Sequence, residues 1–509
     1  MKKFVIAIIL VVMVVSLAFS QAKPGGIARQ ASMGGSQAGY GLVLNPFIMD
    51  DPALIFVNPA YQANYKDYLW MNISGGRLYG SSSSDNGYGQ QNAGVAFGVT
   101  DKLTVGTILS HDPSGVALLP SMMSEISWRS IKYPPSIDNV WEVIGTYEVG
   151  SLDLGLGFTY GWSNRDTTYD QSLKYTLYSP IRRDTTVASS RNSEASSTMF
   201  GFRAGAIYDL GNGSSVDFSG AIRFDDVVDK MTHSPLDTNS FYPYNRYGGE
   251  YSASATEIQF SARAKMKVSN KFNFVPYGTI MMISAEPKED KRVPLRSYES
   301  QWLAKFPETY TYTLDGLAYA LGVGGEYHTQ SFYFAGGVSL QSGSMEEESK
   351  YKFSYDGWTG SMYDTMTYDQ SYKSEFKYTT IPVINLGAEW SATDWLTCRI
   401  GYQRAIGSLN LTSESKETRS ALHDSTYYRV SSANLEYNLS MANSFIFVGG
   451  LNPSTFDGLV TLGVGFKFGG FALDATVSEE ALRRGLGLFG SNDNLNTFGF
   501  MTASYNFTE

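Results

Sequence analysis

Apolar and polar residues alternate with a period of two along much of this chain. The clearest stretch runs from Leu459 to Val477, and the pair Gly469 and Gly470 divides it into halves. A period of two indicates extended strands, and a Gly-Gly break indicates a tight hairpin. The apolar row of the first half comprises Val460, Leu462, Val464, Phe466 and Phe468. The pattern therefore predicts a β-hairpin with one apolar and one polar face.

The connectors between such segments alternate between short and long. The short ones lie at residues 100–102, 150–151, 211–213, 269–271, 328–330, 392–394 and 469–470. The long ones are polar and rich in Tyr, Ser, Asp and Thr, as in the stretch from Ser163 to Ser197. Strict alternation is typical of an up-and-down membrane barrel with short periplasmic turns and long outer loops. A soluble sandwich would have more evenly short connectors.

The two faces of the predicted strands differ in a way that favours lipid as the solvent of the apolar row. In residues 152–162 the apolar row ends in Tyr160 and Trp162, and the opposite row carries Asp153 and glycines. Polar rows with opposite charges suit a lumen, and terminal aromatic rings suit membrane interfaces. We expect these polar-row side chains to face the lumen: Asp153, Asp217, Arg223, Arg399, Lys467 and Asp474. Arginine at Leu154 or Val464 should impair insertion more than at Gly155 or Thr461.

About sixteen segments carry the pattern. They centre near residues 69, 95, 104, 143, 154, 200, 218, 258, 274, 317, 334, 384, 400, 464, 473 and 501. Residues 444–450 are a further candidate, either a strand or part of an outer loop. The chain ends in an alternating, aromatic segment that resembles the closing strand of bacterial barrels. Residues 66–509 are therefore predicted to be all-β, forming one closed antiparallel transmembrane β-barrel of 14–16 strands.

The N-terminus and the composition indicate the compartment. Residues 1–20 have a basic start, an apolar run and a small-residue end, as in a secretory signal peptide. No later apolar run reaches the roughly 18 residues of a membrane helix. The 51 Gly, 35 Tyr and 29 Phe with only 17% charged residues suit a large barrel with aromatic girdles. We expect a protein of the bacterial outer membrane, in contact with outer-membrane lipid.

Residues 21–65 do not alternate, and prolines interrupt their compact apolar stretches. Because they are too apolar for the periplasm and too irregular for the wall, they are predicted to fold into the barrel as a plug. Their motif resembles that of the FadL-like outer-membrane transporters of fatty acids and aromatic hydrocarbons. The matching residues are Met33, Gly34, Gly35, Asp50, Asp51, Asn58, Pro59 and Ala60.

This resemblance implies a hatch inside a fourteen-stranded barrel, from which hydrophobic substrates leave sideways through the wall. A related branch, which includes the outer-membrane shuttle of type IX secretion, shares the motif, and residues 462–485 look closer to that branch. The sequence departs from the family at Tyr61 and Gln62, where the family has Gly-Leu.

The residues give little support for catalysis, metal binding or nucleic-acid binding. The four histidines are scattered and stand in no nucleophile motif or zinc spacing, so we expect no enzyme, no metal site and no cofactor. Cys398 lies in an apolar row, as a small hydrophobe would. A net charge of −10 without a basic cluster argues against nucleic acid as a partner.

Two functions of different classes therefore remain open. The first is passive uptake of hydrophobic small molecules through a plugged barrel. The second is a binding or assembly platform that grips secreted or surface proteins, as in the type IX shuttle. A plain porin is third, since a plug counts against it. An apolar lumen beside the N-terminal segment would favour transport, and a sealed lumen with exposed apolar loops would favour a platform.

Overall fold

The computed structural model describes most of the chain. The described residues are 25–37, 43–74, 91–111, 137, 139–177, 183–235, 249–290, 302–359, 362–421, 424–441, 459–477 and 498–507. The predicted signal peptide and the candidate strand at residues 444–450 lie outside these residues.

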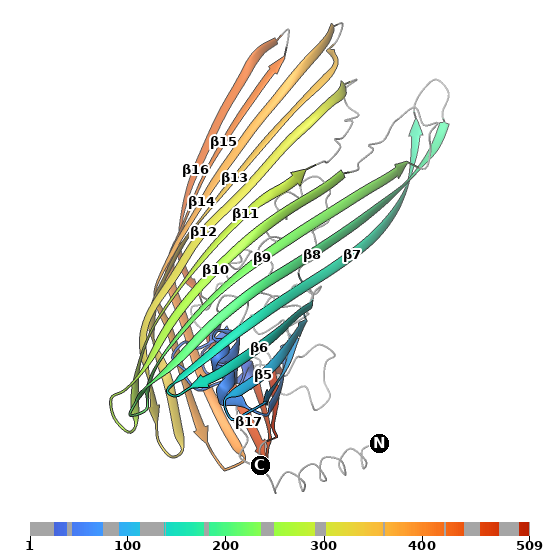
Figure 1. The fold of residues 1–509 in the computed structure, drawn as a ribbon. Helices are drawn as coiled ribbons and strands as arrows, with labels where there is room; N and C mark the ends of the chain where they lie inside the picture. The colour runs from blue at the N-terminus through green and yellow to red at the C-terminus, as the bar shows by residue number, and fades with distance from the viewer. Residues whose placement is uncertain are drawn as a thin grey trace.

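In the described part of the chain, sixteen antiparallel strands close a ring in which each pairs with the next along the chain and the last pairs with the first (Figure 1). The predicted all-β barrel is confirmed, and the sixteen patterned segments correspond to these strands one by one. The strands are β3 (Tyr68–Ser74), β4 (Gln91–Gly98), β5 (Leu103–His111), β6 (Asn139–Val149), β7 (Leu152–Leu177), β8 (Arg183–Gly211), β9 (Ser214–Pro235), β10 (Gly249–Lys267), β11 (Phe272–Asp290), β12 (Trp302–His328), β13 (Phe332–Thr359), β14 (Met362–Ser391), β15 (Leu396–Ala421), β17 (Leu459–Phe468), β18 (Phe471–Val477) and β19 (Phe498–Asn506).

One further wall strand, β16 (Asp424–Met441), was not among the predicted segments. It pairs with the upper part of β15, and Met441 lies opposite Ala405. The first residue of β17, Leu459, lies opposite Gln403 on the same strand. β16 and β17 therefore occupy one strand position beside β15.

The predicted short turns are confirmed, and all seven lie at the end of the barrel drawn at the bottom in Figure 1, here called the lower end.

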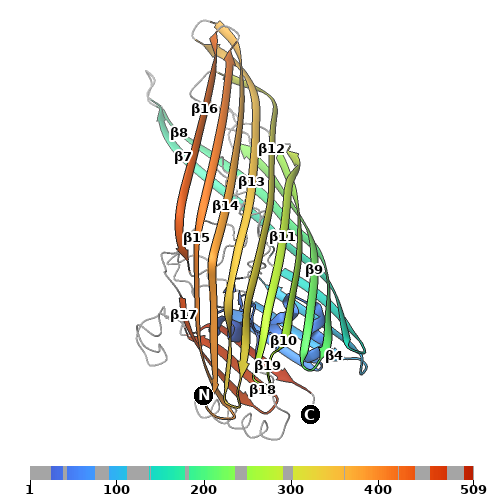
Figure 2. The ribbon, with the colours of Figure 1, turned by 90° about the vertical axis from the view of Figure 1, so that its left-hand side faces the viewer.

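The long connectors are shorter than predicted, because the strands extend into them. Residues 163–177 and 183–197, expected as a loop, continue β7 and β8 as a paired ladder from Ser163 opposite Ser197 to Leu177 opposite Arg183. These residues are polar without a regular apolar row, so their sequence gives no strand signal. Figure 2 shows β7–β16 rising far above the short strands.

The outer face of the wall carries an apolar belt. On β12 the outward side chains Leu317, Tyr319, Leu321, Val323 and Tyr327 are each about half exposed. These ten residue steps span roughly 33 Å along the strand, or about 25 Å of height at a tilt near 40°. Trp390 and Trp395, 47% and 48% exposed, mark the lower border of the belt. This height and chemistry match a membrane interior, so the protein is a transmembrane barrel of the bacterial outer-membrane type.

The N-terminal residues form short elements of their own. These are α2 (Ile27–Ser32), a small sheet of β1 (Ser36–Gln37) and β2 (Val43–Leu44), and the 3-10 helices η1 (Pro52–Phe56) and η2 (Pro59–Tyr65). No helix among the described residues has the length and hydropathy needed to cross a membrane.

Candidate functional site

The N-terminal segment, residues 25–65 as far as they are described, lies inside the lower end of the barrel. Helix α2 contacts β15, β17, β18 and β19, whereas η2 contacts β5–β8 on the other side of the ring. Figures 1 and 2 show these elements surrounded by the wall. The apolar side chains Phe47, Ile48, Leu54 and Ile55 of the N-terminal segment are at most 1% exposed. The segment thus contacts opposite sides of the ring near the short turns.

The motif residues explain how the segment folds. Asp51 caps η1 by accepting a hydrogen bond from the Ala53 amide at 2.8 Å, and Asn58 caps η2 through the Ala60 amide at 3.0 Å. Each cap precedes a proline at the first helical position, Pro52 or Pro59, where a missing N–H costs nothing.

Two further motif residues sit where the segment meets the wall. Gly34 has φ +71°, and a Cβ there would lie 2.3 Å from the Leu386 carbonyl oxygen, so only glycine fits. The neighbouring Met33 is fully buried against Ile48 and Ala335. Gly35 donates to the Gln30 carbonyl at 2.9 Å, which closes the end of α2.

A buried ion network joins the segment to three wall strands. Arg29 pairs with Asp51 at 3.1 Å and with Glu389 of β14 at 3.0 Å. Glu389 also pairs with Arg399 of β15 at 2.6 Å, and Arg399 with Asp474 of β18 at 2.6 Å. The backbone amides of residues 25 and 26 donate to Asp474 and Asp51. Five alternating charges therefore hold helix α2 against the wall.

Other contacts fix the segment around the rest of the ring. Tyr61 donates to Asp217 of β9 at 2.6 Å, and Asp217 pairs with Arg263 of β10 at 3.1 Å. The Met49 amide donates to Glu326 of β12 at 2.9 Å. Arg203 of β8, itself paired with Glu142 of β6, donates to backbone carbonyls of η1. Because these partners surround it, the segment is held on all sides.

Burial changes the acidity of several groups in the segment. It raises the pKa of the Tyr61 and Tyr65 hydroxyls well above 10, so both stay protonated and donate, Tyr61 to Asp217 and Tyr65 to Asp50 at 3.2 Å. Burial also raises the pKa of Asp51 to about 6, although Arg29 lowers it. At neutral pH the Arg29 and Asp51 charges are therefore both present.

The six residues proposed to face the lumen fall into three groups. Arg399, Asp474 and Asp217 are at most 3% exposed and contact the N-terminal segment or its partners. Arg223 lies higher on β9 and pairs with Glu257 of β10 at 3.7 Å. Asp153 and Lys467 lie near the lower turns and are half-buried, and Lys467 is close enough to Glu389 and Asp474 to be attracted by their charges.

Six charged residues that contact the N-terminal segment or its partners were not predicted from the sequence, namely Arg29 and Glu389 of the network and, elsewhere, Glu142, Arg203, Arg263 and Glu326. The wall residues among them stand on the polar rows of their strands, and this signal could have found them. Arg29 gives no periodic signal, because the N-terminal segment does not alternate.

The inner-row positions expected to tolerate arginine better than the outer ones contact the N-terminal segment closely. A Cβ at Gly155 would lie 2.3 Å from the Ala60 backbone nitrogen. Thr461 donates to the Ser32 carbonyl at 3.2 Å. Arginine at either position would therefore displace part of this segment.

Above the segment, the inner wall carries both apolar and polar side chains. On the inner face of β11–β15, Met281, Ile283, Leu314, Ala318, Val383 and Ala405 stand among the buried polar side chains Ser339, Gln341 and Thr380. The inner face of β9 and β10 carries Val227 and Ala255 beside Arg223, Asp225 and Glu257. The described residues contain no group of three or more His, Cys, Asp or Glu side chains placed to hold a metal ion.

Comparisons with known proteins find only distant structural similarity. No family model matches the chain, and no curated protein matches it. A solved FadL homologue from Pseudomonas aeruginosa is 13% identical with a TM-score of 0.34, and the match covers 81% of this chain and 99% of that one.

Two other solved barrels are similarly distant. The CymD monoaromatic hydrocarbon channel is 12% identical with a TM-score of 0.31, covering 78% of this chain and 99% of its own. The P. aeruginosa protein FpvA, solved bound to pyoverdines, is 9% identical with a TM-score of 0.29, covering 82% and 64%. At these values the similarities assign neither a family nor a function.

Proposed function

We propose that this protein is a passive outer-membrane channel for hydrophobic small molecules, of the fatty acid or aromatic-hydrocarbon class. The observation that carries the proposal is the run of apolar side chains on the inner face of β11–β15. It starts directly above the N-terminal segment with Val383 and Ala405 and continues upward through Ala318 to Leu314, among buried polar side chains such as Ser339 and Gln341. A hydrophobic solute gains free energy on contact with these apolar side chains.

In this proposal the N-terminal segment is the barrier. Its apolar core and its ion network fill the lower lumen, so ions have no wet path, and the motif residues keep the barrier folded. A porin would need an open polar lumen at the same height.

Deleting residues 27–60 tests the barrier. We expect the full-length protein to conduct ions poorly in planar bilayers and the deleted protein to form a stable ion-conducting pore. Folding of both is checked by heat-modifiable migration on gels. High ion conductance of the intact protein would refute the barrier and favour a porin.

Uptake of a labelled fatty acid and a labelled arene tests the cargo. Ala318→Asn places an amide on the apolar inner face, and we expect it to slow uptake several-fold. Ser408→Asn on the exposed outer face of β15 is the matched control and should leave uptake unchanged. A closed channel without uptake of either probe, together with a co-purifying protein, would instead support the assembly platform.

A further inference from the structure

Three charged side chains stand together on the inner wall above the N-terminal segment, here called the lumenal cluster. Arg223 of β9 lies directly opposite Glu257 of β10, and Asp225 is the next inward residue above Arg223. Asp225 is close enough to the other two to sense both charges. Arg223 lies roughly 20 Å along β9 above Asp217, which binds Tyr61 of the N-terminal segment. A solute that reaches the segment from above therefore passes the cluster.

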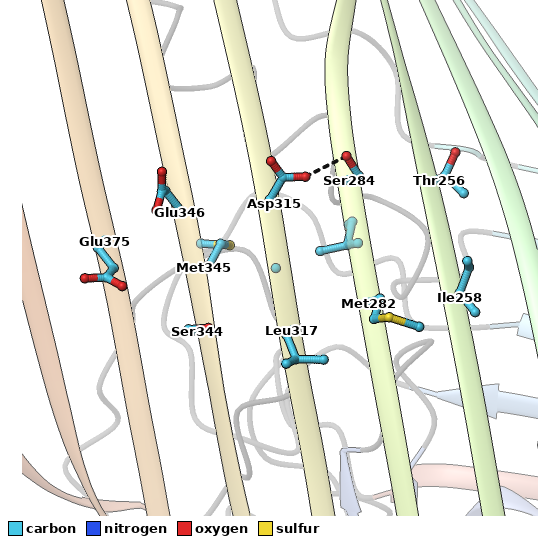
Figure 3. A pocket seen from close by; sticks show the side chains of 12 residues that line it. Thr256, Ile258, Met282, Ser284, Asp315, Leu317, Ser344, Met345, Glu346 and Glu375 are labelled. Atoms are coloured by element: carbon cyan, nitrogen blue, oxygen red, sulfur yellow. Dashed lines mark hydrogen bonds between the residues drawn. The ribbon is translucent and has the colours of Figure 1, made fainter.

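The neighbours of these residues show which way the three side chains point. Ile258, next to Glu257, lines a groove on the outer face of the wall (Figure 3). Phe224, between Arg223 and Asp225, is 42% exposed in the apolar belt. Successive side chains of a strand point to opposite faces of the sheet. The three charged side chains therefore point into the lumen.

The cluster has fewer donors than its acceptors require. Arg223 pairs with Glu257 at 3.7 Å through Oε2, but Oε1 of Glu257 accepts no hydrogen bond from the described part of the chain, and neither does Oδ1 of Asp225. The two acidic residues are 4% and 8% exposed. Two carboxylates beside one guanidinium carry a net negative charge, and a buried carboxylate oxygen without a donor costs free energy. A positively charged donor would relieve both costs.

Apolar side chains flank the cluster. Ile283 and Met281 of β11 are inward residues beside β10, and Ile283 lies directly opposite Glu257. On the other side, Met199 of β8 lies opposite Asp225. The guanidinium of Arg223 would repel a divalent metal ion, and the two carboxylates would repel an anion. The surroundings therefore fit a cationic group on an apolar body.

We propose that the lumenal cluster binds the ammonium group of a hydrophobic amine. The ammonium donates to Oδ1 of Asp225 and Oε1 of Glu257, and its charge neutralises the cluster. The apolar body of the amine lies on Ile283 and Met281. This inference rests on the proposed function, and it adds that among hydrophobic solutes the lumen prefers an amine to a carboxylate.

Binding of labelled 2-phenylethylamine to the purified full-length protein in detergent, measured by equilibrium dialysis at neutral pH, tests the proposal. The matched probe is 3-phenylpropionate, which has a similar size and carries a carboxylate in place of the ammonium. A hydrogen bond to a charged group contributes roughly tenfold or more in affinity, so the amine should bind at least about tenfold more tightly. Equal binding of the two probes, or no saturable binding of the amine, would overturn the site.

Charge-changing variants separate binding from folding. Asp225→Asn with Glu257→Gln leaves Arg223 as the only charge of the cluster at nearly constant volume, so 3-phenylpropionate should now bind more tightly than the amine. The control, Glu346→Gln with Glu375→Gln, removes two carboxylates from the outer groove and should keep the wild-type preference (Figure 3). Equal loss of both probes in the lumenal variant would show a structural role only and overturn the site. Heat-modifiable migration confirms that both variants are folded.

Uptake of the labelled arene by the wild-type protein tests the proposed function separately. Arene uptake without a preference for the amine in dialysis would overturn the ammonium site alone. A binding preference that inverts in the lumenal variant, without uptake of any probe by the wild type, would support the site and refute transport.

Discussion

Replacing Arg399 with leucine should destabilise the barrel strongly, because Arg399 is at the centre of the buried network. Its guanidinium pairs with Glu389 and Asp474 at 2.6 Å each, and its side chain is fully buried. Without it, Arg29 alone offsets the charges of Glu389, Asp474 and Asp51. Breaking a buried pair by removing one partner costs roughly 3 to 5 kcal/mol, since the remaining charge stays desolvated.

The assay is reversible urea unfolding of the full-length protein in lipid vesicles. Lys350→Leu is the matched control, because it removes a cation from an exposed pair with Glu348, 60% and 39% exposed, and should cost at most about 1 kcal/mol. Arg399→Leu should also raise ion conductance, since helix α2 loses its anchor on β15. Equal stability of the two variants would refute the network as a structural element.

Two further changes test the belt and the motif. Leu156→Arg, at a position 68% exposed in mid-belt, should reduce the free energy of membrane folding by roughly 2 to 4 kcal/mol. Leu210→Arg, beside the lower turn on β8, should cost about 1 kcal/mol or less, and equal costs in vesicle folding would contradict the belt. Asn58→Ala removes the η2 cap and the amide donated to the carbonyls of Ala206 and Phe218. It should cost about 1 to 2 kcal/mol in urea unfolding, whereas Asn58→Ser, whose hydroxyl can keep the cap, should cost less, and a loss as large as for alanine would argue against the cap.

The sequence by itself determined the barrel, its sixteen-strand ring and the positions of its short turns. These depend on local patterns, because one lipid-facing row per strand and one turn per hairpin are imposed residue by residue. It did not reveal β16 or the upper ladders of β7 and β8. The upper parts of β7 and β8 are polar without a regular apolar row, and the register of all three strands is set by pairing with the neighbouring strand.

The tertiary structure alone decided what fills the lumen. The polar rows predicted that Asp217, Arg399 and Asp474 would face inward, but not that Tyr61 and Arg29 would meet them. Those contacts join residues hundreds of positions apart in the chain, and an irregular segment has no period from which to infer them. The same holds for the lumenal cluster, because only the register between β9 and β10 places Glu257 opposite Arg223 and beside Asp225.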